Sequence, residues 1–328
     1  MQFDSYHFEN VTSTMEVIRQ LLPNVKEKTQ ENGRGVIVTA DFQRKGRGRI
    51  EGRAWRAAPG TAMLATIAIP QDASQGILLQ DAPSKSQVFP LLAGLAVHSV
   101  LHMVFETQLV RAQSSLADLM KTMPNRMPRP FLLKWPNDIL GFAPSKGASV
   151  AMTPESISGS PLYKKLSGIL CEAIPGWYLA GVGLNLVEGS YPEELKDKAT
   201  SLAEVLKASL KALNETYNEE YGETYEGSVP ALESPDPAMD FSSCLANRIA
   251  QKIADELQNP FWKDEYEKNL WAKGARVSFV VGHPERGEVL DGVVEGIDEA
   301  GCLILALPNG EKRHFLAGEI ASLEVSFQ

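Results

Sequence analysis

Two apolar segments flank a cationic, glycine-rich stretch, and this arrangement limits the possible folds more than any other feature. The segments "GVIVTADFQ" and "TAMLATIAIP", residues 35–43 and 61–70, are each predicted to form a buried β-strand. Between them, "QRKGRGRIEGRAW", residues 43–55, carries five basic side chains and three glycines. Long connections inside a compact domain are often binding loops. The sequence therefore predicts a β-sheet in which a cationic binding loop joins two strands.

Three other segments are predicted to form helices, because their apolar residues suit helical packing. Residues 13–22, "STMEVIRQLL", place apolar side chains on one face, and Ser13 or Thr14 is suited to cap this helix. Residues 88–106 form a strongly apolar segment and are expected to be a core helix. Residues 245–258 repeat an apolar side chain every four positions, which indicates an amphipathic helix.

Strand-like segments continue along the chain. Residues 131–140, 165–174 and 177–186 are apolar runs with polar or glycine residues at one end, so we expect three more strands in one sheet with a helix behind it. From about residue 270 the pattern alternates with period two, and glycines mark the turns. This pattern predicts a small all-β module at the end of the chain.

Two insertions are expected to interrupt the compact part. The first, about 141–163, is rich in Gly, Ser and Pro, and the second, about 212–238, is acidic. Segments of such composition lack the apolar residues that a packed core needs. Both are therefore predicted to be mobile loops.

Composition limits the function. The formal net charge of −9 argues against a broad surface for nucleic acid or anionic membranes, because such surfaces gather Lys and Arg widely. The amino terminus lacks the regions of a signal peptide, and no apolar run is expected to reach the ~20 residues of a membrane span. The three cysteines lie far apart, which suits free thiols in a reducing compartment. We therefore expect a cytoplasmic protein.

The basic stretch has the residues to bind an anion. Glycines let the backbone approach a ligand closely, and the guanidinium groups of Arg47, Arg49 and Arg53 match phosphate or carboxylate. A solvated basic loop and a nucleic-acid hook stay open as alternatives. Trp55, at the end of the stretch, either stacks on a purine or closes an apolar lid.

Other polar residues interrupt the apolar strands. The motif "KWPND", residues 134–138, supplies a cation, a turn and a carboxylate, and is either a catalytic edge or an Asx-type turn. Lys165 precedes a strand in which Gly168 leaves room for a ligand. His98 and His102 have the spacing of helical metal ligands, but they lie in an apolar segment and are expected to be packed or surface histidines.

Taken in order, these motifs resemble the biotin protein ligase family. The set comprises "STM", "QRKGRGRIEGRAW", "KWPND", "KLSGILCE", "GVGLNL" and "GEIASLE", and it extends over most of the chain. The resemblance is to monofunctional members, because the residues before Ser13 are too few for an N-terminal DNA-binding domain, and no DNA binding is expected. It implies an α+β fold, with a mixed sheet flanked by helices over residues 1–268 and a small SH3-like β-barrel over residues 269–328.

The resemblance also implies an activity. Members use ATP and biotin, with Mg²⁺, to form biotinyl-5′-AMP, and then transfer biotin to a lysine of a biotin carboxyl carrier protein domain. A carboxylate and a triphosphate repel each other, so cations are needed where they meet. An acyl-adenylate also needs protection from water, which a closing loop provides. A homodimer is possible, since strand edges in this family often pair subunits.

The site residues that the resemblance implies fall into three groups. Catalytic roles are expected for Lys165, Asp138, Arg47 and Arg49. Biotin contacts are expected from Ser13, Thr14, Gln43, Gly46, Arg47, Lys165, Gly168 and Gly183. Nucleotide contacts are expected from Arg49, Arg53, Trp55, Lys134, Asn137 and Asn185. No dedicated metal ligands are expected, because the substrate phosphates would hold Mg²⁺.

The chain departs from the family pattern at several positions. Met15 stands where Asn is common, Arg44 where Thr is frequent, and Glu324 where an arginine is often found. The pair Ile50 and Glu51 fills a position that usually holds one residue. Two other functions therefore remain open: a lipoate or octanoate ligase or transferase on the same fold, and a protein that binds biotin or a nucleotide without turnover.

Overall fold

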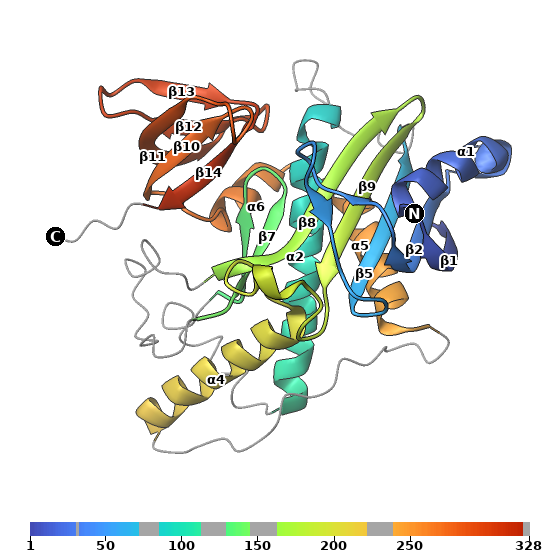
Figure 1. The fold of residues 1–328 in the computed structure, drawn as a ribbon, viewed down its shortest axis with the longest axis horizontal. Helices are drawn as coiled ribbons and strands as arrows, with labels where there is room; N and C mark the ends of the chain where they lie inside the picture. Colours follow the sequence, from blue (N-terminus) through green and yellow to red (C-terminus); the bar gives the residue numbers. More distant parts are fainter. Residues whose placement is uncertain (31–32, 72–84, 113–128, 145–162, 222–238, 324–328) are drawn as a thin grey trace.

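The computed structural model consists of a large sheet with helices around it, a smaller C-terminal sheet and a short hairpin (Figure 1). The helices α1, α2 and α5 lie against the large sheet, and the C-terminal sheet stands beside it. The structure describes residues 1–30, 33–71, 85–112, 129–144, 163–221 and 239–323.

The described residues form a larger sheet of seven strands in the order β1, β2, β5, β9, β8, β7, β6. β1 runs parallel to β2, whereas all other neighbours are antiparallel, so the predicted mixed sheet is confirmed. In sequence order the strands are β1 (Phe3–Val11), β2 (Gly35–Gln43), β5 (Ala62–Pro70), β6 (Phe131–Lys134), β7 (Asp138–Phe142), β8 (Tyr163–Ile174) and β9 (Trp177–Asn185).

Both faces of the sheet are covered at β2 and β5, which explains why these strands are apolar almost throughout. Successive side chains of a strand point to opposite faces. On β2, Val36 and Val38 join the cluster that contains Ile18 of α1 (Thr14–Gln30), whereas Ile37 joins the main core on the other face. A strand between two helical layers has no solvent face on which polar residues would be favourable.

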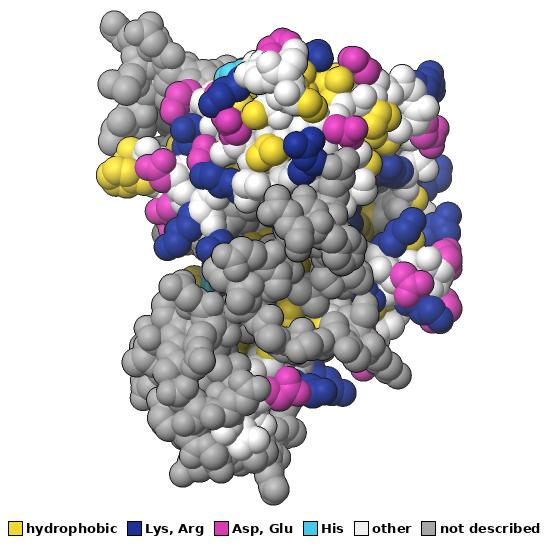
Figure 2. Space-filling view, turned by 90° about the vertical axis from the view of Figure 1, so that its left-hand side faces the viewer, with side chains coloured by type: hydrophobic (Ala, Val, Ile, Leu, Met, Phe, Trp, Pro, Cys, Tyr) yellow, Lys and Arg dark blue, Asp and Glu magenta, His cyan; other side chains and the backbone are white. Residues whose placement is uncertain are grey.

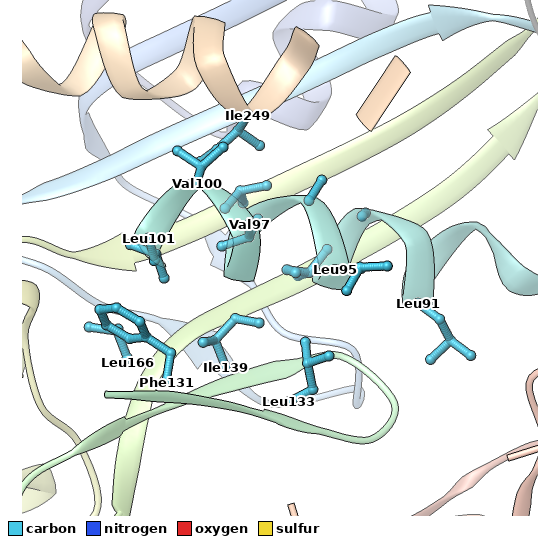
Figure 3. Packing of buried hydrophobic residues seen from close by; sticks show 14 of the residues in the cluster. Leu91, Leu95, Val97, Val100, Leu101, Phe131, Leu133, Ile139, Leu166 and Ile249 are labelled. Carbon is cyan, nitrogen blue, oxygen red and sulfur yellow. The ribbon is translucent and has the colours of Figure 1, made fainter. Parts of the chain in front are cut away.

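The main core lies between the sheet and the long helix α2 (Lys85–Ala112), with α5 (Phe241–Glu256) packed beside it. In Figure 3 side chains of α2 point toward β6, β7 and β8 on one side, and Val100 meets Ile249 of α5 on the other. Each large apolar side chain buried in this way stabilises the fold by ~1.5–3 kcal/mol. The labelled residues are Leu91, Leu95, Val97, Val100, Leu101, Phe131, Leu133, Ile139, Leu166 and Ile249.

By length and composition alone, one helix is long and apolar enough to span a membrane, so the expectation that there is no such segment is wrong. Residues Ser86–Ala112 reach a mean hydropathy of 1.9 over an 18-residue window. However, 78% of that window is buried inside the protein. The apolar character of α2 therefore belongs to the core, as predicted for residues 88–106.

The C-terminal strands form an antiparallel sheet in the order β13, β12, β11, β10, β14. The all-β module is confirmed, but the strand pairs among the described residues do not close it into the predicted barrel, since β13 and β14 remain the two edges. The strands are β10 (Arg276–Val281), β11 (Val289–Ile297), β12 (Leu303–Ala306), β13 (Lys312–Phe315) and β14 (Gly318–Leu323). The helix α6 (Trp262–Lys268) and residues 269–275 lead into them.

The two predicted insertions are shorter than expected. Residues 141 and 142 complete β7, and residue 163 begins β8. The helix α4 (Leu202–Tyr221) extends through residues 212–221, because Ala212 and Leu213 are buried on its apolar side. The remaining parts, 145–162 and 222–238, lie outside the described residues.

Two strand predictions also need correction. Residues 131–140 are a β6–β7 hairpin that turns at "WPN", and not one continuous strand. The polar amino terminus forms β1, whose pairing with β2 was not predicted because its residues are mostly half-buried or exposed.

Figure 2 shows how the charged side chains are distributed on one face of the molecule. There, Lys and Arg side chains of the described residues are interspersed with Asp and Glu. This mixed face has no broad cationic area among those residues.

Candidate active site

The cationic stretch is a short hairpin and not an irregular loop. Its strands β3 (Gly46–Arg47) and β4 (Ala54–Trp55) pair antiparallel, and the Gly48 amide donates to the Arg53 carbonyl at 2.8 Å. Glu51 lies in the turn at the tip and is exposed, so solvent screens its negative charge. The additional residue relative to the family pattern is thus absorbed by the turn.

A first cavity lies beneath this hairpin, where the end of β2 and the middle of β5, β8 and β9 meet the start of α1. It brings together polar residues of the helix start, glycines of β8 and β9, and cations of the hairpin and β8. Its lining is Ser13, Thr14, Met15, Gln43, Arg47, Gly48, Arg49, Trp55, Ala65, Thr66, Asn137, Lys165, Gly168, Ile169, Leu170, Gly181, Val182 and Gly183.

The polar wall of the first cavity is fixed by a small hydrogen-bond network. The Thr14 backbone amide donates to Oε1 of Gln43 at 2.8 Å, and the Thr14 hydroxyl donates to the same oxygen at 3.1 Å. The hydroxyls of Thr14 and Thr66 are 2.8 Å apart. Because Oε1 of Gln43 is taken by Thr14, its amide NH₂ group is the end available to a ligand acceptor.

Two glycines form the opposite wall and carry the indole of Trp55. A Cβ atom at Gly183 would lie 2.6 Å from Cε2 of Trp55, and one at Gly168 would lie 3.3 Å from the same ring. The indole therefore rests where any other residue would place a side chain. Nε1 of Trp55 is buried and has no hydrogen-bond acceptor among the described residues, so it is a donor that a ligand could satisfy.

Met15 occupies the far end of the first cavity. A Cβ atom at Gly181 would lie 3.0 Å from the Met15 terminal methyl, so this side chain fills the space that the glycine leaves. Met15 is 3% exposed. The end of the cavity is consequently more apolar than it would be with an amide at position 15.

A second cavity lies between the hairpin, the "KWPND" turn and β14 of the C-terminal sheet. It shares Gly48, Arg49, Trp55, Asn137 and Lys165 with the first cavity, so the two cavities meet at these residues. Its full lining is Gly48, Arg49, Ile50, Arg53, Ala54, Trp55, Lys134, Trp135, Pro136, Asn137, Asp138, Lys165 and Glu319. Four cations face two carboxylates, so the cavity is cationic.

Lys165 and Asp138 meet at the junction of the two cavities. Nζ of Lys165 lies 2.8 Å from Oδ1 of Asp138. The β7–β8 register shifts between Ile139 and Leu140, and such a bulge re-aims the side chains beside it. On its other side, the Lys165 backbone pairs with residues 198–200 through hydrogen bonds of 2.8 and 2.9 Å. The backbone of the lysine is therefore held on both edges.

The hairpin arginines contact the C-terminal sheet. Arg49 donates to the Gly318 carbonyl at 3.0 Å, and Arg53 pairs with Glu319 at 3.0 Å. The pKa of Arg49 is lowered, mainly because its guanidinium loses water there, although Asp138 and Glu319 favour the charged form. An anion in the second cavity would offset this loss of hydration.

Lys134 lies deeper in the second cavity. Its Nζ stands 5.3 Å from the ring centroid of Trp271, a cation–π geometry. Burial lowers the pKa of Lys134, and the nearby Asp138 opposes this effect.

Most of the expected site residues therefore converge on the two cavities, and two do not line them. Gly46 pairs with Trp55 in the hairpin, where a Cβ atom would lie 2.6 Å from the Trp55 carbonyl oxygen. Asn185 is buried, and its side-chain amide donates to the Thr200 carbonyl at 2.9 Å. Both residues support the site through the backbone around it.

Sequence reasoning missed Thr66, Gly181 and Glu319. Thr66 was the one hydroxyl inside an otherwise apolar strand, which is a usable signal for a residue that faces a polar cavity. Gly181 lies inside the predicted strand 177–186, where a glycine by itself does not indicate a cavity wall. Glu319 was hidden in the period-two pattern, because nothing local indicates that β14 lies against the hairpin.

The histidine pair of α2 packs in the core. His98 is bonded through Nε2 to the Phe131 carbonyl at 3.2 Å, and the two imidazole rings are 4.5 Å apart. Within the described ranges, no group of three or more His, Cys, Asp or Glu side chains is arranged to hold a metal ion.

Comparisons with known proteins show what the chain is similar to. Residues 283–321 match the family model described as "Biotin protein ligase C terminal domain". The biotin–[acetyl-CoA-carboxylase] ligase of Mycobacterium tuberculosis is 25% identical over 299 residues, which cover 88% of this chain and 79% of that protein.

Solved structures define the fold. The biotin protein ligase from Aquifex aeolicus in complex with biotin and ATP is 21% identical, with a TM-score of 0.53 and 97% of each chain covered. A point mutant of that ligase in complex with biotin gives a TM-score of 0.54 at 20% identity, covering 98% of this chain and 97% of the mutant. The fold is that of an α+β domain of the biotin protein ligase type. The chain is a relative of the biotin protein ligases.

Proposed function

We propose that the chain is an ATP-dependent biotin–protein ligase, which forms biotinyl-5′-AMP and then transfers biotin to a lysine of a carboxylase carrier protein. The observation that carries the proposal is the meeting of the two cavities at Arg49, Asn137 and Lys165. A carboxylate in the first cavity and a phosphate in the second would come together at these groups. The names of the relatives support the same chemistry.

In the first step a carboxylate oxygen of biotin forms a bond to the α-phosphorus of ATP. The bond between that phosphorus and the bridging oxygen breaks, and pyrophosphate leaves with the electron pair. Arg47, Arg49 and Lys165 would bring the two anions together and stabilise the charge that develops at phosphorus. Arg53 and Lys134 line the second cavity, where they would bind the remaining phosphates.

Trp55 suits the junction of the two substrates. Its indole lies on Gly168 and Gly183, and it lines both cavities. One ring face would close the first cavity while the other is offered to the adenine. The unsatisfied Nε1 would donate to an oxygen of the intermediate.

In the second step the amine of a carrier lysine attacks the carbonyl carbon of the mixed anhydride, and AMP leaves. The amine must lose a proton as the amide forms. Asp138 is the carboxylate nearest the junction, and it would accept or orient that proton once Lys165 turns toward phosphate.

Mg²⁺ would enter with ATP as part of the substrate. The described residues provide no cage of three or more ligating side chains, so the phosphates would supply most of the coordination. The ion would neutralise the leaving pyrophosphate.

The remaining features of the proposal concern the whole molecule. We place residues 1–268 in a catalytic unit and residues 269–328 in a C-terminal unit. Limited proteolysis that cuts first between residues 269 and 275 would support this division.

The free cysteines suit a reducing cytoplasm. A homodimer formed through sheet edges is expected to appear in sedimentation at working concentration, and a monomer alone would contradict it.

The direct test is ATP–pyrophosphate exchange with the purified protein, Mg²⁺ and either biotin, lipoate or octanoate. We expect exchange with biotin, and its loss in Lys165→Ala and Arg47→Ala. Lys164→Ala is the matched control, because the neighbouring lysine bonds to the Lys196 carbonyl and lines neither cavity.

The other outcomes separate the alternatives. Exchange with lipoate or octanoate in preference to biotin would reassign the acid on the same fold. Biotin binding in calorimetry without exchange of any acid would indicate a binding protein, with Met15 as the first position to restore. Each of these results would contradict the proposal.

A further inference from the structure

The indole of Trp135 connects the "KWPND" turn to the C-terminal sheet. Trp135 is 2% exposed, and its Nε1 donates to the Gly301 carbonyl at 2.9 Å. Its ring centroid lies 6.2 Å from that of Phe279 on β10. A buried donor that reaches across to a carbonyl 166 positions later fixes both partners, since leaving either group unpaired is unfavourable.

The residues before Trp135 strengthen the same connection. The Leu133 amide donates to the Asn269 carbonyl at 2.9 Å, and the Trp271 amide donates back to the Leu133 carbonyl at 2.8 Å. Lys134 lies over the ring of Trp271. The segment that leads into the C-terminal sheet is thus held along β6, directly beside the turn.

The C-terminal sheet in turn holds the hairpin arginines. Phe279 packs so tightly against Gly318 that a Cβ atom at Gly318 would lie 2.1 Å from the Phe279 ring. The Gly318 carbonyl accepts from Arg49, and Glu319 pairs with Arg53. The position of Phe279 therefore decides where β14 meets the hairpin.

The residues after Trp135 reach the junction of the cavities. Asn137 exchanges two hydrogen bonds with Ile169, both of 2.9 Å, one through its side-chain amide and one through its carbonyl. Asp138 pairs with Lys165. The turn therefore contacts Lys165 directly through Asp138. It is also connected to the hairpin arginines, because Trp135 contacts Phe279 and Phe279 packs against β14.

We propose that Trp135 is a positioning residue that sets the distance between the hairpin arginines and Lys165 by anchoring the C-terminal sheet. The inference rests on the proposed ligase function for its catalytic consequence, although the mechanical connection does not depend on it. Groups that stabilise a transition state must be held to within a fraction of an ångström, and a remote shift of about 1 Å can lower the rate about 100-fold.

The test compares Trp135→Leu, Trp135→Phe and the matched control Trp177→Leu in the full-length chain. Trp177 is also 2% exposed, but it lies in the cluster beside α1, six residues before Gly183 on β9. The first readout is hydrogen–deuterium exchange of residues 46–55 without substrate. We expect faster exchange of these amides in Trp135→Leu and no change in the Trp177→Leu control.

The second readout is ATP–pyrophosphate exchange at varied ATP and at varied biotin. We expect kcat/KM for ATP to fall by about 100-fold in Trp135→Leu while biotin affinity in calorimetry is retained. Trp135→Phe keeps the ring on Phe279 and loses only the bond to Gly301, so it is expected to recover most of the activity. A merely structural role would lower both substrates' parameters together and would not distinguish Trp135 from Trp177.

The two proposals fail in different ways. If the unmodified protein shows no pyrophosphate exchange with any acid, the ligase function is wrong, and hydrogen exchange of the hairpin still tests the connection. If hairpin exchange is the same in Trp135→Leu as in the unmodified protein, the positioning role is wrong whatever the enzyme does. Should the leucine variant not fold, Phe279→Leu provides this comparison, because it removes the ring that contacts both Trp135 and Gly318.

Discussion

Nζ of Lys165 lies 2.8 Å from Oδ1 of Asp138, on neighbouring antiparallel strands at the point where the two cavities meet. Under the proposed function, this salt bridge holds a phosphate-binding cation and a proton acceptor next to each other. In the proposed reaction, a substrate phosphate that pairs with Lys165 frees Asp138, and a substrate amine that contacts Asp138 frees Lys165.

Asp138→Asn is expected to separate the two steps. The amide preserves the shape and still contacts Lys165, but it cannot accept a proton, so transfer from purified biotinyl-5′-AMP to a carrier domain should fall about 100- to 1,000-fold. Pyrophosphate exchange should fall much less. Single-turnover transfer measured beside exchange checks this, and an equal loss in both assays would remove the assigned role of Asp138.

Gly183→Ala is expected to weaken biotin binding. The new methyl group would lie 2.6 Å from the Trp55 ring, so the indole must move out of the first cavity, and overpacking of this kind costs about 1–3 kcal/mol. Calorimetry with biotin and Trp fluorescence report the change. Gly94→Ala in α2 is the control, since its nearest neighbour would be 3.6 Å away and binding should be unaffected. Unchanged biotin affinity in Gly183→Ala would place the acid elsewhere.

The buried histidines are expected to make stability depend on pH. Burial lowers the pKa of His98 to about 3, where the neighbouring His102 adds to the effect, and lowers the pKa of His102 to about 4, where Arg129 adds to it. In the unfolded chain both protonate near pH ~6.5, so the unfolded state binds more protons below that value. The free energy of unfolding should therefore fall as the pH drops from about 6.5 to about 4.

Denaturant titrations of His102→Leu at pH 7 and pH 4.5 check this dependence. Nε2 of His102 is buried and has no hydrogen-bond partner among the described residues, so the substitution removes the proton site without breaking a bond there. The variant should lose less stability than the unmodified protein as the pH falls, by roughly 3 kcal/mol at most. Parallel curves for the two proteins would show that His102 does not contribute.

The start of α5 gives a stability test far from the site. Asp240 caps the helix, with Oδ1 accepting from the Ser243 amide at 2.9 Å and Oδ2 from the Ser243 hydroxyl at 2.7 Å. Asp240→Ala should lower the free energy of unfolding by about 1 kcal/mol, whereas Asp240→Asn should lose much less. Thermal denaturation measures both, and pyrophosphate exchange should be unchanged. Equal losses in the two variants would argue against the cap.

How much of the fold could be predicted from the sequence depends on the kind of interaction that stabilises each element. The apolar strands β2 and β5 and the helix α2 were predictable, because burial on both faces leaves a continuous apolar pattern. β1 was not, since it is an edge strand whose side chains alternate only between half-buried and exposed, apart from the buried Val11. The division of residues 131–140 into a hairpin was not predicted, because the motif "KWPND" indicates a turn but does not show that the chain then pairs back with β6.

In the candidate site, too, local motifs could be predicted from the sequence, whereas a contact between distant segments could not. The ordered motifs predicted a set of residues that all line the first cavity, namely Ser13, Gln43, Arg47, Lys165, Gly168 and Gly183. The contact of Glu319 with Arg53 joins residues 266 positions apart. No local pattern carries such a distance, because it depends on how the C-terminal sheet is placed.

The pairing of residues 269–271 with β6 has a consequence for assembly. That segment adds a parallel bridge between Leu133 and Leu270 to the outer side of β6, so one edge of the large sheet is partly occupied by the chain itself. β1 is the opposite edge. Two copies that joined their large sheets across a twofold axis would therefore meet through β1, and in each copy β2, whose Gln43 lines the first cavity, would lie one strand away from the contact.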